Sequence, residues 1–233
     1  MKRALLVLAL VACERDRGVH VHIPPEHLGS RSTFHLRWDG QLTSPDGAVH
    51  GMHQELGLVI EVASMGPDGH AERLRVTVDR HDDVVDGTPK PTLSGTYEVT
   101  RDGTAMRADG KPLAPHEQAF FREWHVGTDD TTALQHEFRA GETYRPTPAE
   151  AQTFALPPSK QPFVLTVRRA TDAEIVLAGE YEPVDAPVNV EAHGKLVVTL
   201  TPQGHSRVGD LTFRSQGNDV GALHATTELR RQR

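Results

Sequence analysis

Histidine is unusually frequent in this chain, at 14 of 233 residues, and imidazole is a common ligand of zinc and copper. The close spacings are His20 with His22, His50 with His53, and His116 with His125 beside Trp124. We take His50 and His53 as the candidate metal ligands. A metal ion needs three or four converging ligands, and the sequence pairs these two with no third one. A histidine-based zinc or copper protein is therefore an alternative function, set against scattered histidines that face solvent.

The sequence lacks the usual catalytic and phosphate-binding motifs. It contains no Gly-x-Ser-x-Gly elbow, no Ser-x-x-Lys pair and no glycine-rich phosphate loop. The run from His81 to Gly87 holds three carboxylates, but their spacing does not fit a helix-loop-helix calcium site, so we expect a solvated acidic turn. We expect no cofactor and no enzyme activity. A hydrolase is the third alternative, and its structural sign would be a cleft where a histidine and a carboxylate come within hydrogen-bond reach.

Four aromatic residues in the middle of the chain form the candidate ligand site. Phe120, Phe121 and Trp124 fall at helical spacing after Pro115, and Phe154 belongs to a second short helical stretch. If both helices lie on one face of a curved sheet, these rings can line a groove for an apolar or lipid-like ligand. The alternative interpretation is that the rings pack in an ordinary hydrophobic core.

Alternating apolar residues predict that β-strands make up most of the chain. The clearest run is Leu74, Val76 and Val78, which alternates with polar residues and forms a predicted hairpin with the strand at 56–62. Further strands are predicted near 34–42, 97–99, 104–107, 163–167, 175–181, 196–200, 211–213 and 223–229. We expect a mainly β fold: an antiparallel sheet, sandwich or half-barrel with two short helices packed on it. The end at 230–233 is interpreted as a solvated tail.

Two local patterns refine this picture. Thr147-Pro-Ala-Glu150 is a capping box, with threonine as the cap and glutamate at the third helical position, and the helix must end before Pro157. The turns Pro67-Asp-Gly-His70 and Pro202-Gln-Gly-His205 each separate two apolar runs. This echo indicates either two related β halves or the reuse of turn residues for steric reasons.

The first residues have the layout of an export signal. Met1, Lys2 and Arg3 precede an apolar run from Ala4 to Ala12, which is too short to span a bilayer as a helix. Leu10-Val11-Ala12-Cys13 resembles the lipobox of bacterial lipoproteins, and Cys13 is the only cysteine in the chain. The resemblance implies cleavage before Cys13, acylation of Cys13 with chains such as palmitate, and a lipid anchor in the cell envelope. Glu14 in place of aspartate favours the outer membrane over the inner one.

The chain is therefore divided into a signal peptide at 1–12, a lipidated tether at 13–30 and a single β-rich domain at 31–233. The net charge of −7 is a poor match for nucleic-acid phosphates. We expect a membrane-anchored envelope lipoprotein, on the periplasmic side or the cell surface, that is non-enzymatic. It binds an apolar or lipid-like ligand, or it serves as an interaction module for another envelope protein.

Overall fold

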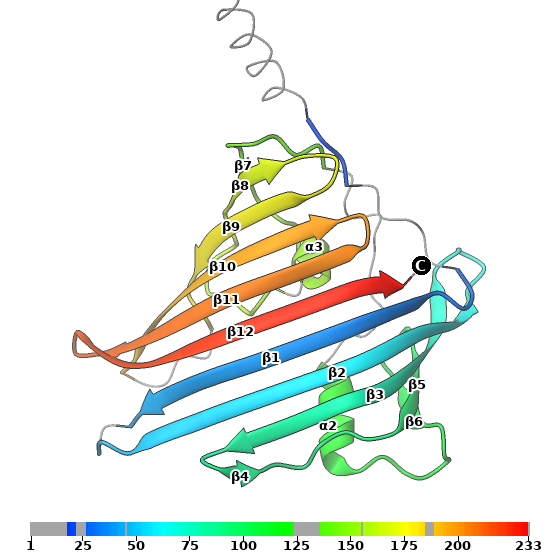
Figure 1. Cartoon of the computed structure of the whole chain (residues 1–233), viewed down its shortest axis with the longest axis horizontal. Helices are drawn as coiled ribbons and strands as arrows, with labels where there is room; N and C mark the ends of the chain where they lie inside the picture. The colour runs from blue at the N-terminus through cyan, green and yellow to red at the C-terminus, as the bar shows by residue number, and fades with distance from the viewer. Residues whose placement is uncertain are drawn as a thin grey trace, which may run out of the picture.

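The computed structural model describes residues 18–21, 27–44, 46–123, 136–154, 156–184 and 189–232 (Figure 1). These residues form one antiparallel sheet of 12 strands, which confirms the predicted mainly β class. The strands are β1 (Arg31–Thr43), β2 (Val49–Met65), β3 (Ala71–Val85), β4 (Thr88–Pro89), β5 (Thr96–Thr100), β6 (Ala105–Arg107), β7 (Thr143–Tyr144), β8 (Leu165–Ala170), β9 (Ile175–Tyr181), β10 (Glu191–Thr201), β11 (Gly204–Ser215) and β12 (Asn218–Gln232).

The sheet is open and continuous, in the order β6-β5-β3-β2-β1-β12-β11-β10-β9-β8-β7, with β4 beside β3. Within the described ranges it is thus one layer of strands rather than the two layers of a sandwich, and its edges β6 and β7 do not pair. The chain enters at the centre in β1, runs outward strand by strand to β6, crosses to β7, and returns to β12. The first and last long strands therefore lie side by side, with Arg31 opposite Gln232 and Leu42 opposite Gly221.

Two hydrophobic cores lie on the same side of this sheet. The N-wing core is formed by Phe34, Leu56, Leu58, Val62, Ala71, Leu74, Val76, Leu93, Tyr97, Val99 and Phe121. The C-wing core is formed by Val19, Val21, Phe138, Tyr144, Phe154, Phe163, Leu165, Val167, Ile175, Leu177, Leu196, Val198 and Leu200. Directly paired residues share a face of a sheet, and the paired row from Phe34 through Leu229 and His205 to Leu200 connects the two cores.

Helix α2 (Pro115–Glu123) covers the N-wing core (Figure 1). Its Glu117 is buried and accepts three hydrogen bonds: from the Tyr97 hydroxyl at 2.5 Å, from Arg107 Nη1 at 2.6 Å and from the backbone N–H of Ala114 at 2.7 Å. One carboxylate thus caps the helix and joins it to β5 and β6. One turn later, the Phe121 ring packs 4.8 Å from the Tyr97 ring.

The second predicted helix is reduced to the six-residue segment α3 (Pro148–Thr153). The predicted capping box is confirmed, because the Thr147 N–H donates to Glu150 Oε2 at 2.7 Å and the Glu150 N–H donates to Thr147 Oγ1 at 3.3 Å. Both helical segments carry the pattern Pro-x-Glu-x-x-x-Phe, as Pro115, Glu117 and Phe121 and as Pro148, Glu150 and Phe154. In each case the phenylalanine enters the core of its own wing.

Two sequence interpretations need correction. Residues Arg230 to Gln232 belong to β12 and lie opposite Arg31 to Thr33, so they are part of the central strand pair and not a solvated tail. The run that we expected to be an acidic turn is mostly strand, because β3 continues to Val85. Only Asp86 and Gly87 turn the chain, with φ angles of 53° and 72°.

Part of the predicted tether is packed against the domain. Val19 and Val21 are buried in the C-wing core, and Val19 exchanges two backbone hydrogen bonds with Phe138, at 2.8 and 2.9 Å. Residues 1–17 and 22–26 lie outside the described ranges. No helix in the described residues is long and apolar enough to cross a membrane.

The two hairpins with similar turns occupy corresponding places in the sheet. β2 and β3 follow β1 on one side of the centre, and β11 and β10 follow β12 on the other. From the centre of the sheet outward, however, the strand numbers increase on one side, from β1 to β3, and decrease on the other, from β12 to β10. The chain therefore passes through the two hairpins in opposite directions. The relation between the two halves stays a prediction.

Candidate functional site

An apolar strip runs along the helix side of the sheet between the two cores. We call it the helix-side strip and define it as Trp38 and Leu42 of β1, Leu223 of β12, and Leu211 and Phe213 of β11. Regular pairing places all five side chains on one face of the sheet. Trp38 and Leu42 are separated by an even number of positions in β1 and so point to the same side. Leu211 lies directly opposite Leu223 in the pairing of β11 with β12. Three adjacent strands thus present apolar side chains to the same side as α2 and α3.

Residues of the helix-side strip are more accessible than their neighbours in the two cores. Trp38 is 39% exposed, whereas Phe34, four residues earlier on the same face of the same strand, is 7% exposed. Leu211, Phe213 and Leu223 are likewise only partly buried. Burying apolar area stabilises a protein by about 25 cal/mol per Å², so this partial exposure leaves free energy that a ligand can gain by covering the strip.

Glycines shape the strip by receiving large side chains from the neighbouring strands. A Cβ on Gly40 would lie 2.7 Å from Leu223 Cδ1, and a Cβ on Gly194 would lie 2.0 Å from the Tyr181 ring. Leu223 and Tyr181 therefore lie over the bare backbone of the adjacent strand. Large-on-glycine pairs of this kind give a sheet curvature while filling the gap that the glycine leaves.

One end of the strip carries two buried polar residues. Arg207 of β11 and Thr227 of β12 lie directly opposite each other, with exposures of 9% and 5%. Burial lowers the pKa of the Arg207 guanidinium, which remains a cation at neutral pH. The Thr227 hydroxyl oxygen has no hydrogen-bond partner among the residues that the structure describes. This arrangement places a cation and a hydroxyl at the end of an apolar surface.

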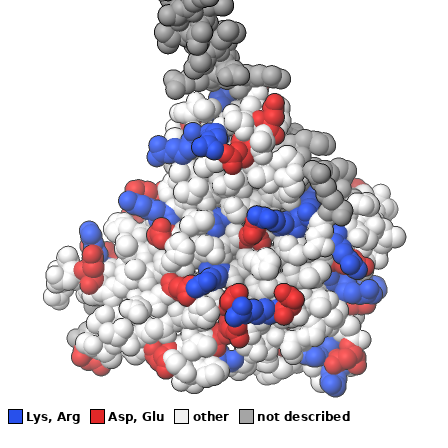
Figure 2. Space-filling model, in the orientation of Figure 1, with Lys and Arg blue, Asp and Glu red and all other residues white. Residues whose placement is uncertain are grey.

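The opposite side of the sheet, which we call the polar face, carries paired charges (Figure 2). One row of directly paired residues crosses six strands with alternating chemical character: His53, Asp39, His224, Asp210, Lys195 and Glu180. The Nδ1 atoms of His53 and His224 each lie 2.7 Å from the carboxylate of their partner, Asp39 and Asp210. Such cross-strand pairs favour one register and keep this side of the sheet hydrated.

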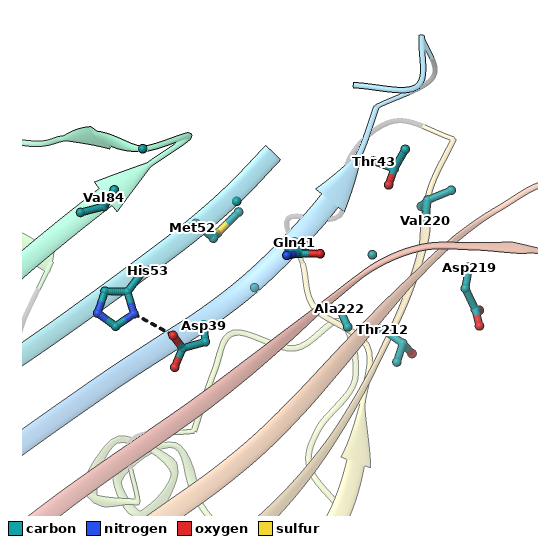
Figure 3. Close-up of a pocket in the computed structure, with 14 residues that line it drawn as sticks. Asp39, Gln41, Thr43, Met52, His53, Val84, Thr212, Asp219, Val220 and Ala222 are labelled. Carbon is teal, nitrogen blue, oxygen red and sulfur yellow. Dashed lines mark hydrogen bonds and ion pairs between the residues drawn. The ribbon is translucent and has the colours of Figure 1, made fainter. Parts of the chain in front are cut away.

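A groove of about 820 Å³ lies at one end of the polar face (Figure 3). His53 and Asp39 form one wall, Asp219 and Val220 lie at the other end, and small residues such as Ala222 lie between them. A histidine held by a carboxylate is the base and its orienting group in a hydrolytic triad. The described residues that line this groove include no serine, cysteine or lysine, and their hydroxyl groups are those of Thr43 and Thr212.

The groove therefore contains the sign that we set for a hydrolase, but the same pairing recurs elsewhere on the surface. His50 Nδ1 lies 2.8 Å from Asp86, and His136 Nε2 lies 2.9 Å from Glu142. The hydrogen bond from Arg37, followed by that from His53, lowers the pKa of Asp39, and the hydrogen bond with Asp86 raises the pKa of His50. The histidine–carboxylate pair of the groove is therefore one of several such pairs in the described part of the chain.

The two candidate metal ligands do not converge. His53 contacts Asp39 of β1, whereas His50 contacts Asp86 at the end of β3. Three residues apart on a strand, they are separated by about 10 Å and point to opposite faces. The residues that the structure describes contain no group of three histidine, cysteine or acidic side chains placed to hold a metal ion.

The three candidate aromatic residues that the structure describes do not line one groove. Phe121 is 2% exposed in the N-wing core, and Phe154 is fully buried in the C-wing core. Phe120 is partly buried and meets the Phe121 ring edge-on at 5.2 Å. Trp124 and the predicted lipidation site Cys13 lie outside the described residues. The rings of Phe121 and Phe154 therefore anchor the two helical segments, one to each wing.

Sequence reasoning missed the helix-side strip as a site. The alternation of Phe34, Leu36 and Trp38 predicts an apolar face for β1, but it cannot show which part of that face a helix covers. Accessibility depends on the pairing of β1 with β12, whose residues are up to about 200 positions away. Arg207 gave no local signal either, because it lies between the predicted strands at 196–200 and 211–213, and only the observed bounds of β11 put it at an inward strand position.

Comparisons with known proteins give little for this chain. No protein family and no curated protein sequence matches it. One solved structure, described as "lipid-protein interactions in lipovitellin", has a TM-score of 0.42 and 10% sequence identity, over 89% of this chain and 25% of that one. The chain spans about a quarter of the length of that protein.

Proposed function

We propose that this protein is a lipid-anchored protein of the bacterial cell envelope that binds an apolar, lipid-like ligand on the helix-side strip. The observation that carries the binding function is the partial exposure of Trp38, Leu211 and Leu223 between two fully buried cores. The strip replaces the groove of Phe120, Phe121, Trp124 and Phe154 as the proposed binding surface.

The dimensions of the strip suit an extended hydrocarbon chain. From Arg207 to Phe213 the strand advances about 20 Å, and three strands span about 10 Å across. One layer of acyl chains fills half of a bilayer's hydrocarbon core, or about 15 Å. A single acyl chain laid along the strands would therefore cover about three quarters of this 20 Å length.

The anchor is proposed on the basis of the basic start, the short apolar run and the sole cysteine at the end of the lipobox-like sequence. Full-length wild-type chain and the Cys13→Ala variant would be expressed in a bacterial host with an alkyne analogue of palmitate. We expect wild-type protein in the membrane fraction with label on Cys13, and unlabelled variant in the soluble fraction. A variant that stays in the membrane without label would refute the lipid anchor.

Ligand binding can be tested on the full chain by native mass spectrometry from lipid nanodiscs, compared with the mass of the denatured chain. We expect an added mass of several hundred daltons that is lost in Leu211→Gln. The matched control is Val208→Gln, which changes a 42% exposed residue of the same strand on the polar face. Absence of the added mass in the wild type would instead favour an interaction module, and its loss in both variants would place the ligand elsewhere.

A further inference from the structure

The polar end of the helix-side strip points to the chemical class of the ligand, given the binding function proposed above. We infer that the ligand is an amphiphile with an oxyanion head group, carboxylate or phosphate, which contacts Arg207 and Thr227 while its acyl chain lies along the strip.

A cation lies beside the apolar residues of the strip. Arg207 is 9% exposed and lies on the inward face of β11, between Val198 of the C-wing core on β10 and Thr227 on β12. A guanidinium offers five N–H donors in a planar fork that matches two oxygens of a carboxylate or phosphate. Charge-assisted hydrogen bonds of this geometry are stronger than neutral ones, so the site favours an anion over an alcohol.

Thr227 supplies the second, independent observation. Thr227 is only 5% exposed, and its hydroxyl oxygen has no hydrogen-bond partner within the described part of the chain. A buried hydroxyl without a partner costs about 1 to 3 kcal/mol, and a ligand oxygen beside it would remove that cost. Because Thr227 is the register partner of Arg207, one head group can contact both.

The order of residues along β11 gives the orientation. Inward positions after Arg207 are Gly209, Leu211 and Phe213, and those of β12 in the same direction are Ala225 and Leu223. Charge is thus confined to one end, and small or apolar residues follow for about 20 Å. The head group would lie at Arg207 and the end of the acyl chain near Phe213.

The test uses isolated envelope membranes that contain the full chain. They are incubated separately with three photoreactive, clickable probes of equal chain length: a fatty acid, a lysophosphatidic acid and the corresponding fatty alcohol. After irradiation, labelled tryptic peptides are identified. Peptides 208–214 and 215–230 of the wild type report on the strip, as do the longer peptides 196–214 of Arg207→Met and 208–230 of Arg214→Met, which each lack one cleavage site. We expect the two anionic probes to label these peptides about tenfold more than the alcohol. Preference for one anionic probe would distinguish a carboxylate from a phosphate head group.

Variants separate the head-group assignment from the binding function. Arg207→Met and Thr227→Val should reduce the ratio of anionic to alcohol labelling by about tenfold and severalfold, respectively, whereas Arg214→Met, an exposed arginine of the same strand, should leave it unchanged. Equal labelling by all three probes in the wild type would overturn the oxyanion head group while supporting an apolar ligand. No labelling of the strip by any probe would overturn both. If Arg207→Met fails to fold and loses all labelling, the wild-type ratio and Thr227→Val still decide.

Discussion

The Tyr97 hydroxyl donates a 2.5 Å hydrogen bond to Glu117 Oε1, and this contact joins helix α2 to strand β5 in the interior of the N-wing. Burial by itself would raise the pKa of Glu117. The hydrogen bonds from Tyr97 and the Ala114 N–H, together with the charge of Arg107, outweigh burial and hold the pKa below its ordinary value. Glu117 is therefore an ionised group around which three elements are organised.

Glu117→Gln should lower the free energy of unfolding by about 2 kcal/mol, because an amide cannot replace an ionised acceptor of three hydrogen bonds. Urea denaturation followed by circular dichroism measures this change. Glu72→Gln, at an exposed position of β3, is the matched control and should change stability by less than about 0.5 kcal/mol. Equal effects of the two substitutions would contradict the organising role of Glu117.

The three tyrosines should resist ionisation while the protein is folded. Burial and the hydrogen bond to Glu117 raise the pKa of Tyr97 to about 12, and burial also raises the pKa values of Tyr144 and Tyr181. The unfolded chain has tyrosine pKa values of about 10, so the raised pKa values in the folded protein mean that the neutral phenols contribute to stability below pH 10. This contribution is lost as the pH rises through the pKa values of the folded protein. Tyrosinate absorbance and circular dichroism should therefore change together above pH 10. A tyrosine that titrates near pH 10 with the β signal intact would contradict this.

Gly194→Ala should destabilise the protein by about 2 kcal/mol or more, since the new methyl group would lie 2.0 Å from the Tyr181 ring and force it off the C-wing core. Gly209→Ala is the matched control on the inward face of the next strand, where the nearest atom would lie at 3.6 Å. That substitution should be neutral or slightly stabilising. Thermal unfolding of both variants provides the comparison, and similar melting temperatures would argue against the close packing of Tyr181 on Gly194.

Trp38 should report ligand binding by its fluorescence. The chain has two tryptophans, so Trp124→Phe leaves Trp38 as the only one. Its side chain is 39% exposed, and an acyl chain along the strip would shield it from water. Adding palmitate should shift the emission of this variant to shorter wavelength. The reciprocal variant Trp38→Phe shows how far Trp124 itself responds, and an unshifted Trp38 spectrum at saturating palmitate would count against the strip.

Local patterns in the sequence predicted much of the fold. The alternation in Leu74, Val76 and Val78 is confirmed as β3, the hairpin with β2 is confirmed by their pairing, and the Thr147–Glu150 capping box has the predicted hydrogen bonds. These features depend on neighbours within a few residues or across one turn. Propensity and periodicity therefore contain the necessary information.

The site could not be predicted in the same way. Phe121 and Phe154 are close in sequence but belong to different cores, because β7 and β8 lie at the opposite edge of the sheet from β6. The pair Arg207 and Thr227 depends on the register of one hairpin, which a shift of one residue would move to the polar face. Long-range pairing and register decide both cases, and neither has a local signature.

The pairing of β1 with β12 also has a consequence for how the chain folds. Each wing is built from strands that are neighbours in sequence, whereas this central seam joins residues about 200 positions apart. Local hairpins form in microseconds, and distant contacts bear the entropy of closing a long loop. The wings can therefore assemble separately, and the helix-side strip, which lies across the seam, comes into existence only when the two halves of the sheet have met.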